Sequence, residues 1–343
     1  MRITHHTNSF LSAVSHSTTL LCDPWNGSAN YGGWNSLPEL SNDLLSEHIN
    51  KATHIYISHI HSDHFCENVL EKFPDKSIKV IIKNFESKRL YKGIEALGFT
   101  DIIELDDWSI FSIGDFFVAI VPQGLSNSED FDDNLSYDLD TSILVFDKTT
   151  DTLFFHLTDN SFSPQQIKEL LTFCRKHFNK IPDISTLTCG AASEWPQCFP
   201  NLDRQLSKEI YLKRELEKYT NNCLLLNSEF ILPGGGRYCL SGRFSSLNKY
   251  VAIPSHEQLI KATPECSRFL DIEGGGSIEF SIEPATMKRK IVISSALEPT
   301  IDADLMNSLT ASPYDYEKYE SHVDYNSFQI ARAKWLEKVK SLN

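Results

Sequence analysis

Residues 58–65, SHIHSDHF, hold three histidines and an aspartate within six positions: His59, His61, Asp63 and His64. The whole chain of 343 residues has only 12 histidines, so this density is hard to reach by chance. Imidazole nitrogens together with a carboxylate are the ligands of zinc, iron and manganese sites. We therefore predict that the cluster binds metal, in preference to a set of structural histidines.

The residues on either side indicate where the cluster lies. Residues 53–58, THIYIS, are apolar and β-branched, which predicts a buried strand. Residues 63–73, DHFCENVLEKF, carry apolar side chains on one helical face and predict a helix with Ser62 or Asp63 as its N-cap. The histidines thus follow the carboxyl end of a strand, which is where open α/β sheets place their ligands.

Composition excludes some classes of function. The chain has 46 acidic and 32 basic residues, a formal charge of −14 and no Lys/Arg-rich run, which argues against nucleic-acid binding. Its 8 cysteines form no Cys-x-x-Cys pair and are expected to be reduced thiols of a cytoplasmic protein. No window is long and apolar enough to predict a membrane span, and no signal peptide is expected.

Strand and helix patterns continue along the chain in an order that predicts two sheets with helices outside them. Strands are expected at 18–25, 78–84, 102–105, 108–113, 116–122, 141–147, 152–159, 184–190 and 223–233. Helices are expected at 86–97, 163–178, 206–219 and 327–342, and loops at 27–40 and 126–140. Ser163 and Pro164 are the expected N-cap and first residue of the second of these helices.

The cluster in its strand-to-helix setting resembles the metallo-β-lactamase superfamily. The segments ITHHTNSFL, LLCDPW and FFHLTDN follow one another as in the branch that contains ascorbate-6-phosphate lactonase, N-acyl-phosphatidylethanolamine phospholipase D and the C-terminal part of CMP-N-acetylneuraminate hydroxylase. YDLDTSILV, TCGAASEWPQCF and ILPGGGRYCLSGRFSSLN resemble segments of the hydroxylase in the same order. The resemblance implies an α/β fold, an αββα sandwich, over residues 1–250. Residues 251–343 would be a C-terminal extension packed on it.

The resemblance also implies a ligand set. In the family the first two histidines of the motif bind one metal, the Asp-His pair binds a second, and a later aspartate bridges the two. The matching residues here are His59, His61, Asp63, His64 and Asp159. Asp159 also ends an apolar strand, so its carboxylate is expected at the same sheet edge as the histidines. The expected cofactors are one or two divalent ions, zinc first, with iron or manganese as alternatives.

Two ligands of the family pattern are absent from this sequence. Gln123 stands where a third histidine of the first site is expected, and Gly234 or Gly235 stands where the final histidine is expected. His5 or His6 is one candidate replacement. Oxygen ligands from the loop at 126–140 are another, although a solvated loop is the simpler interpretation of its acidic residues, Glu129, Asp130, Asp132 and Asp133.

A hydrolytic reaction is the first interpretation. A bound metal lowers the pKa of water, Asp63 and His64 are the candidate catalytic residues, and Asp63 is expected to orient the water. Arg237 and Arg243, with the backbone amide of Gly235, are candidates for holding a phosphate or carboxylate. We therefore predict a hydrolase of small anionic esters, lactones or phosphodiesters, of the sugar phosphate or nucleotide sugar class.

Two alternatives stay open. An iron-dependent, oxygenase-like enzyme would need a separate reductase, because the chain lacks the set of Cys-x-His and Cys-x-x-His pairs that holds a Rieske cluster. A degenerate, metal-poor protein that binds a small molecule is the third hypothesis. Related proteins often self-associate, so a homo-oligomer is an expectation from the resemblance alone.

Overall fold

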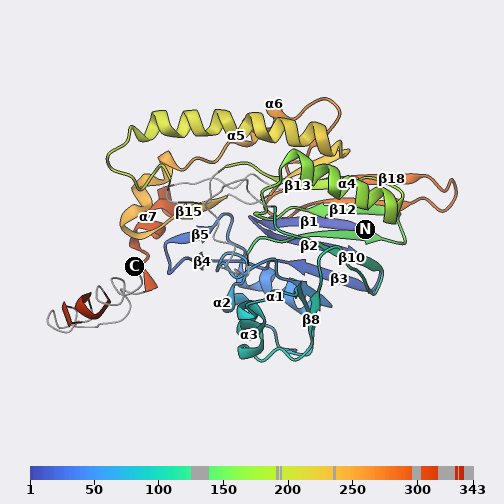
Figure 1. Cartoon of the computed structure of the whole chain (residues 1–343), viewed down its shortest axis with the longest axis horizontal. Coiled ribbons are helices and arrows are strands. Elements are labelled where there is room, and N and C mark those ends of the chain that lie inside the picture. The colour runs from blue at the N-terminus through green and yellow to red at the C-terminus, as the bar shows by residue number, and fades with distance from the viewer. Residues whose placement is uncertain are drawn as a thin grey trace.

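The computed structural model arranges the strands in three sheets and covers them with helices (Figure 1). It describes residues 1–124, 139–190, 193, 195–234, 237–295, 303–315, 329–330 and 332–335. The two large sheets share one apolar layer, and the third sheet is small. It contains β15 (Tyr238–Leu240), β5 (Trp34–Ser36) and β4 (Ser28–Ala29).

The first large sheet combines strands from the beginning and the end of the chain. Its order is β18 (Arg289–Ser294), β17 (Gly276–Ile282), β1 (Arg2–Thr7), β2 (Phe10–Ser15), β3 (Thr18–Cys22), β6 (His54–Tyr56), β7 (Lys79–Lys83) and β8 (Ile102–Leu105). Pairing is antiparallel from β18 to β3 and parallel from β3 to β8. Parallel neighbours need crossover connections, and helices of the chain supply them here.

The second large sheet carries the hairpin that leads into the candidate site. Its order is β16 (Arg268–Phe269), β14 (Phe230–Gly234), β13 (Ile184–Thr188), β12 (Thr152–His156), β11 (Ser142–Asp147), β10 (Phe116–Val121) and β9 (Ile110–Ile113). β9 to β12 pair antiparallel, and β12 to β16 pair parallel. β11 and β12 form the predicted hairpin across the turn KTTD.

Helices cover the outer faces of both sheets, as Figure 1 shows. Those on the first sheet are α1 (Asn42–Lys51), α2 (Glu67–Leu70) and α3 (Arg89–Ala96). Those on the second sheet are α4 (Pro164–Phe178), α5 (Arg204–Leu226) and α6 (His256–Ala262). The 3₁₀ helix η1 (Gly242–Tyr250) packs against α7 (Ala303–Ala311). Ser163 caps α4 and Pro164 is its first residue, as predicted.

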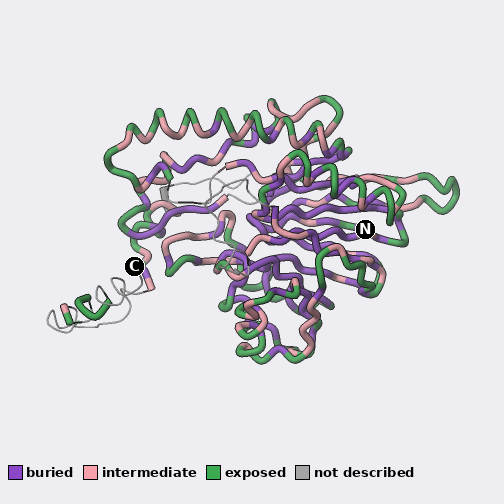
Figure 2. The backbone as a smooth tube through the Cα atoms, in the orientation of Figure 1, coloured by how far each residue is buried: buried purple, intermediate pink, exposed green. Residues whose placement is uncertain are grey.

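Alternation along the strands divides the buried side chains into layers. Phe154 points into the layer between the sheets, where Tyr56 also lies, whereas its neighbour Phe155 packs among the side chains of α4 and α5. This period of two is the geometry of a strand that is buried on both faces. Figure 2 shows the buried backbone concentrated in the sheets. The layers run helix, sheet, sheet, helix, which confirms the predicted αββα sandwich.

Residues after 250 add strands to both sheets. β17 pairs with β1, with Ile278 opposite Ile3, and β16 pairs with β14. Ile278 and Phe280 are buried in the layer between the sheets. The division of the chain near residue 250 stays a prediction, and these strands complete sheets that begin before it.

Three predicted boundaries are wrong. The helix expected at 63–73 is limited to the short α2, whose N-cap is Cys66. The expected loop at 27–40 contains β4 and β5. α5 continues to Leu226, where a strand was expected, because its apolar residues bury at helical spacing; Asn227 then ends it with a left-handed conformation, φ 51°. The helix expected at 327–342 lies largely outside the described residues.

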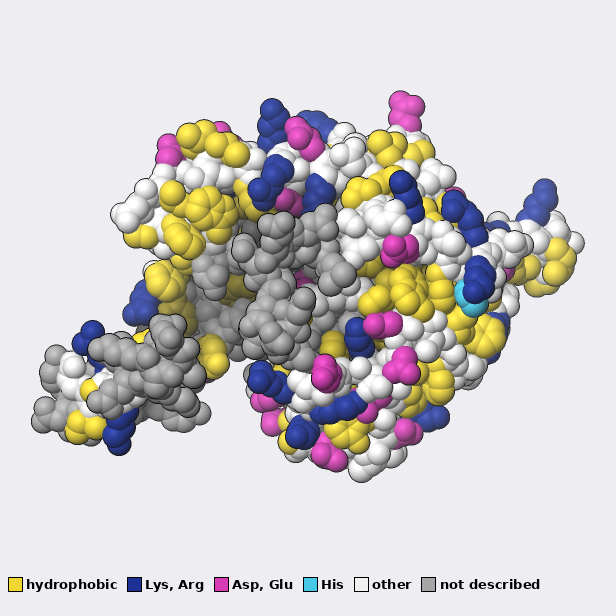
Figure 3. All heavy atoms as spheres, viewed as in Figure 1, with side chains coloured by type: hydrophobic (Ala, Val, Ile, Leu, Met, Phe, Trp, Pro, Cys, Tyr) yellow, Lys and Arg dark blue, Asp and Glu magenta, His cyan; other side chains and the backbone are white. Residues whose placement is uncertain are grey.

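Charged side chains of both signs are interspersed over the face seen in Figure 3. Across the described part of the chain, no helix combines the length and the apolar character that crossing a membrane requires. The expectation that the protein does not bind nucleic acid stays a prediction.

Candidate metal centre

The histidine loop is attached to the second sheet by hydroxyl groups. It begins after β6, whose Tyr56 hydroxyl lies 2.7 Å from the Oγ1 atom of Thr141, just before β11. Thr141 in turn donates to the backbone carbonyl of Ser58, also at 2.7 Å. These contacts hold the ends of strands from both sheets together, so the loop lies at the edge shared by the two sheets.

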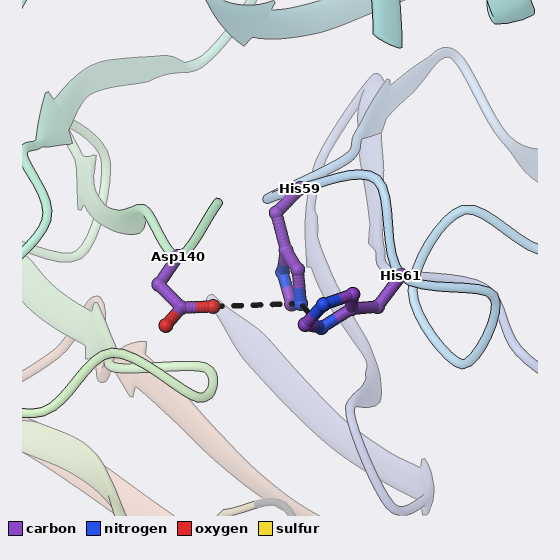
Figure 4. A group of neighbouring side chains, drawn as sticks. All are labelled: His59, His61 and Asp140. Carbon is purple, nitrogen blue, oxygen red and sulfur yellow. Dashed lines mark hydrogen bonds and ion pairs between the residues drawn. The ribbon is translucent and has the colours of Figure 1, made fainter. Parts of the chain in front are cut away.

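His59 and His61 meet an aspartate from the second sheet in the first donor group. The Nε2 atom of His59 lies 2.9 Å from Nδ1 of His61 and 3.5 Å from Oδ1 of Asp140. Figure 4 shows the carboxylate of Asp140 pointing toward the two imidazoles from across the site. One ligand atom from each residue lies within 4.8 Å of the other two.

A second donor group shares His59 and adds His64 and Asp159. The Nε2 atom of His64 lies 3.2 Å from Oδ2 of Asp159 and 3.8 Å from Oδ2 of Asp63. The structure thus brings together all five sequence-predicted ligands, although Asp63 belongs to neither group of three. Asp140 is an additional candidate that the sequence analysis did not name.

Asp23 orients His64 from the side away from the donor groups. Its Oδ2 atom lies 2.8 Å from Nδ1 of His64, and it accepts hydrogen bonds of 2.7 Å from both the backbone N–H and the hydroxyl of Ser58. Such carboxylate–histidine pairs fix the tautomer and ring orientation of a metal ligand. The segment LLCDPW was interpreted as a strand and as part of the family resemblance, and this role of Asp23 was not predicted.

Electrostatic coupling is strong around His64. Burial alone would lower the pKa of His64, but the carboxylates of Asp159 and Asp23 raise it well above its ordinary value. Burial alone would raise the pKa of Asp159, and His64 instead holds it below its usual range. Burial, followed by the charge of His64, lowers the pKa of His59 well below its ordinary value.

Asp63 and Asp140 differ from Asp159, because their pKa values are raised rather than lowered. Burial and the charge of Asp159 raise the pKa of Asp140 to about 6. Burial also raises the pKa of Asp63, and Asp159 adds to the rise while His64 opposes it. The carboxyl groups of Asp63, Asp140 and Asp159 are therefore held close together in a site that is largely shielded from water, and a bound cation would stabilise their charged forms.

The residues present fit a divalent cation. The Nε2 atom of His64 is buried and faces the carboxylates of Asp159 and Asp63, at 3.2 and 3.8 Å, so its position suits a metal ligand. The mixture of imidazoles and carboxylates suits zinc, iron or manganese, and it supplies too many nitrogens for calcium or magnesium.

The histidines suggested as replacement ligands lie outside both donor groups. His5 and His6 belong to neither donor group; their Nε2 atoms contact the carbonyl of Asn8 at 2.7 Å and the hydroxyl of Ser12 at 2.9 Å. The four acidic residues named in the loop at 126–140 lie outside the described residues.

The expected anion-binding residues lie away from the donor groups. Arg237 contacts Glu273, with Nε 2.9 Å from Oε2, and lines a small cavity of about 20 Å³ with His256. Arg243 lies over the rings of Phe244 and Tyr314. Gly235 is outside the described residues. Substrate binding by these residues stays a prediction.

A cavity of about 530 Å³ adjoins the donor groups. Part of its wall is formed by His61, Asp63, Asp140 and Asp159. Other parts come from the end of β13 and from α5. Its size is in the range of small-molecule sites, and it gives a ligand direct access to the candidate metal ligands.

Comparison with solved structures identifies the fold. A possible metal-dependent hydrolase from Veillonella parvula DSM 2008 aligns with a TM-score of 0.57 and 15% identity, over 81% of this chain and 98% of that one. Isothiocyanate hydrolase from Delia radicum gut bacteria aligns with a TM-score of 0.54 and 16% identity, over 82% and 99%. The chain has the metallo-β-lactamase fold. CmlA, a diiron beta-hydroxylase from Streptomyces venezuelae, shares it with a TM-score of 0.51 and 17% identity, over 85% of this chain and 54% of that one.

Sequence comparison gives a shorter match. No family model matches the chain. A protein of Mycolicibacterium smegmatis, named as a Rieske 2Fe-2S iron-sulfur protein, is 30% identical to this chain over 93 residues. The matched residues are 27% of this chain and 18% of the relative. Cys174 and His177 of this chain do have Cys-x-x-His spacing, but Cys174 is on the buried face of α4 and the sequence contains no Cys-x-His pair.

Proposed function

We propose that the protein is a metal-dependent hydrolase, with one or two divalent ions held by two donor groups that share His59: His61 and Asp140 complete the first, and His64 and Asp159 complete the second. The observation that carries this proposal is the convergence of two donor groups on His59 beside one cavity. The shared fold with two proteins named as hydrolases supports it. Zinc is the first candidate, and iron or manganese are the alternatives.

The residues of the site have distinct proposed roles. When bound, the ions supply Lewis acidity and lower the pKa of a water. Asp63 is the candidate base, because its buried carboxylate borders the cavity and its pKa is raised. His64 is held in place by Asp23 and completes the donor set.

The proposed substrate is a small anionic ester, lactone or phosphodiester of the sugar phosphate or nucleotide sugar class. The cavity size and its many polar side chains are compatible with such a molecule. We also propose a cytoplasmic location, consistent with eight free cysteines, of which six are buried. Association between copies of the chain is the remaining partner proposal.

Chelation tests the hydrolase directly. The purified protein is assayed on a panel of esters, lactones and phosphodiesters before and after metal removal, and again after one equivalent of zinc, iron or manganese is added. The proposal expects hydrolysis that disappears with the metal and returns with it. A protein that binds metal tightly but hydrolyses none of the panel would contradict it.

An oxygenase is the second candidate, because three carboxylates approach the site and oxygen-rich sites favour iron. The shared fold with a diiron hydroxylase supports this candidate. It would require a separate reductase. Iron in the purified protein, together with no hydrolysis, would favour it over the hydrolase. Absence of any tightly bound metal would favour the degenerate binding protein.

A further inference from the structure

One face of α5 forms a polar wall of the large cavity. The residues that it contributes are spaced three or four apart, so they lie along one stripe of the helix: Tyr211, Glu215, Lys218 and Asn222. Another stripe of the same helix is buried: Leu212, Tyr219, Cys223 and Leu226. The register of α5 therefore directs a phenol, a carboxylate, an ammonium and an amide toward the space beside the metal centre.

Lys218 is the one lysine or arginine among the described residues that line this cavity. The acidic lining residues are Asp63, Asp140, Asp159 and Glu215. The three aspartates belong to the candidate metal centre, and Glu215 is paired with Arg214 at 3.2 Å. Lys218 forms no ion pair with any residue that the structure describes. Once metal is bound, Lys218 is the unpaired cation available to a ligand in the cavity.

Cys189 provides a second indication that Lys218 acts on the cavity. This thiol lines the cavity, and burial raises its pKa to about 12. Glu215 adds to that rise, whereas the charge of Lys218 opposes it. Both α5 side chains therefore act electrostatically on the same part of the cavity wall.

We propose that Lys218 binds the anionic group of the substrate, a phosphate or a carboxylate, at the α5 wall while the reacting bond lies at the metal centre. An ammonium has three donors and no acceptor, so it matches either anion. Tyr211 and Asn222 offer hydrogen bonds to hydroxyl groups of the same molecule. This inference rests on the proposed function and specifies its substrate as a hydroxyl-rich anion.

The same geometry explains why the two arginines named from the sequence are weaker candidates. Arg237 is engaged with Glu273 beside a different cavity, and Arg243 lies over aromatic rings. Neither is among the residues that line the large cavity. Lys218 was not singled out by sequence reasoning, because an isolated lysine in a polar helix resembles a solvated surface residue.

A pair of variants on one helix tests the proposal. Lys218→Met removes the charge at the cavity wall. Lys213→Met removes the charge of another lysine on the same helix, which is equally classed as exposed but does not line the cavity. Binding of glucose 6-phosphate, gluconate, inorganic phosphate and glucose to the metal-loaded protein is measured by calorimetry. Metal content is determined on every sample.

The expected result is selective. Lys218→Met should weaken binding of glucose 6-phosphate or gluconate by roughly 10- to 100-fold, as loss of a hydrogen bond to a charged group does, and should leave glucose binding and metal content unchanged. Lys213→Met should behave as the wild type. The preference between the phosphate and the carboxylate probe shows which anion is bound.

Other outcomes overturn the inference. Equal effects of the two variants, or a wild type that binds no anion more tightly than glucose, would show that Lys218 is only a solvated surface residue. These results are distinguishable from failure of the proposed function, which would appear as a wild type that hydrolyses none of the panel, whether or not it binds metal. If anion binding by that protein still depended on Lys218, the proposed anion site would be supported and the hydrolase would not.

Discussion

Asp23 contacts the candidate metal centre through His64 without contributing a ligand atom to either donor group. It contacts Nδ1 of His64 and is itself held by Ser58. A buried carboxylate in this position keeps the opposite ring nitrogen directed at the site. Metal binding should therefore depend on a residue that the cluster SHIHSDHF does not contain.

Asp23→Asn tests this role. The substitution preserves the size of the side chain but removes its charge, so the orientation of His64 is weakened. We expect the affinity for zinc to fall by roughly 10- to 100-fold, the range for loss of such a partner. Competition with a chromophoric chelator measures this affinity, and circular dichroism checks the fold. Wild-type affinity in a folded Asp23→Asn protein would contradict the assigned role.

At the scale of elements, the β11–β12 hairpin explains how Asp140 reaches the site. Ile143 pairs with His156, so Asp140 and Asp159, each three residues beyond this pair, lie at the same end of the hairpin. The sequence analysis predicted this hairpin and Asp159, and the same register could have indicated Asp140. It was passed over because the acidic loop before β11 resembled a solvated segment.

The limits of sequence reasoning also show in α5. The run CLLLN at 223–227 is short and apolar, and such runs do not distinguish a strand from a buried helical turn. Burial of Tyr219, Cys223 and Leu226 in one apolar cluster stabilises the helix over the strand. The strands flanked by clear turns were predicted well. The wall of the cavity could not be predicted, because it depends on the register and docking of a distant helix.

α6 begins with a histidine that links it to the C-terminal strands. His256 lies 3.5 Å from Glu273 and also contacts Asp271, while Arg237 and His5 lie nearby. Burial alone would lower the pKa of His256, but Glu273 and Asp271 raise it above its ordinary value of 6.5. A proton bound more tightly in the folded state stabilises that state.

The free energy of unfolding should therefore decrease as the pH rises and His256 loses its proton. The stabilisation from this proton is fully present below about pH 6.5, the pKa of histidine in the unfolded chain, and is lost as the pH rises through the higher pKa of the folded state. Urea unfolding at intervals from pH 6 to 9 measures it. The decline should be smaller in His256→Gln than in the wild type. Parallel profiles for the two proteins would show that His256 is not the group responsible.

At the scale of the whole molecule, residues after 250 are needed to complete the sandwich. β17 lies between β18 and β1 and contributes Ile278 and Phe280 to the layer between the sheets. Removing it would expose the backbone of β1 and open this layer to water. Exposed edge strands of this kind promote aggregation.

A chain that ends at residue 250 is therefore expected to lose cooperative unfolding and to aggregate. Size-exclusion chromatography and thermal denaturation followed by circular dichroism would detect both effects. If the shortened chain instead were monomeric and unfolded as sharply as the full chain, residues 1–250 would be an independent domain, as the sequence division suggests.

The central claim is that His59 holds the metal centre together, because it belongs to both donor groups. Elemental mass spectrometry of the purified wild type, His59→Ala and the exposed control His177→Ala tests it most directly. We predict about one to two zinc, iron or manganese ions per chain in the wild type and the control, and none in His59→Ala. Equal metal content in all three proteins would contradict the account.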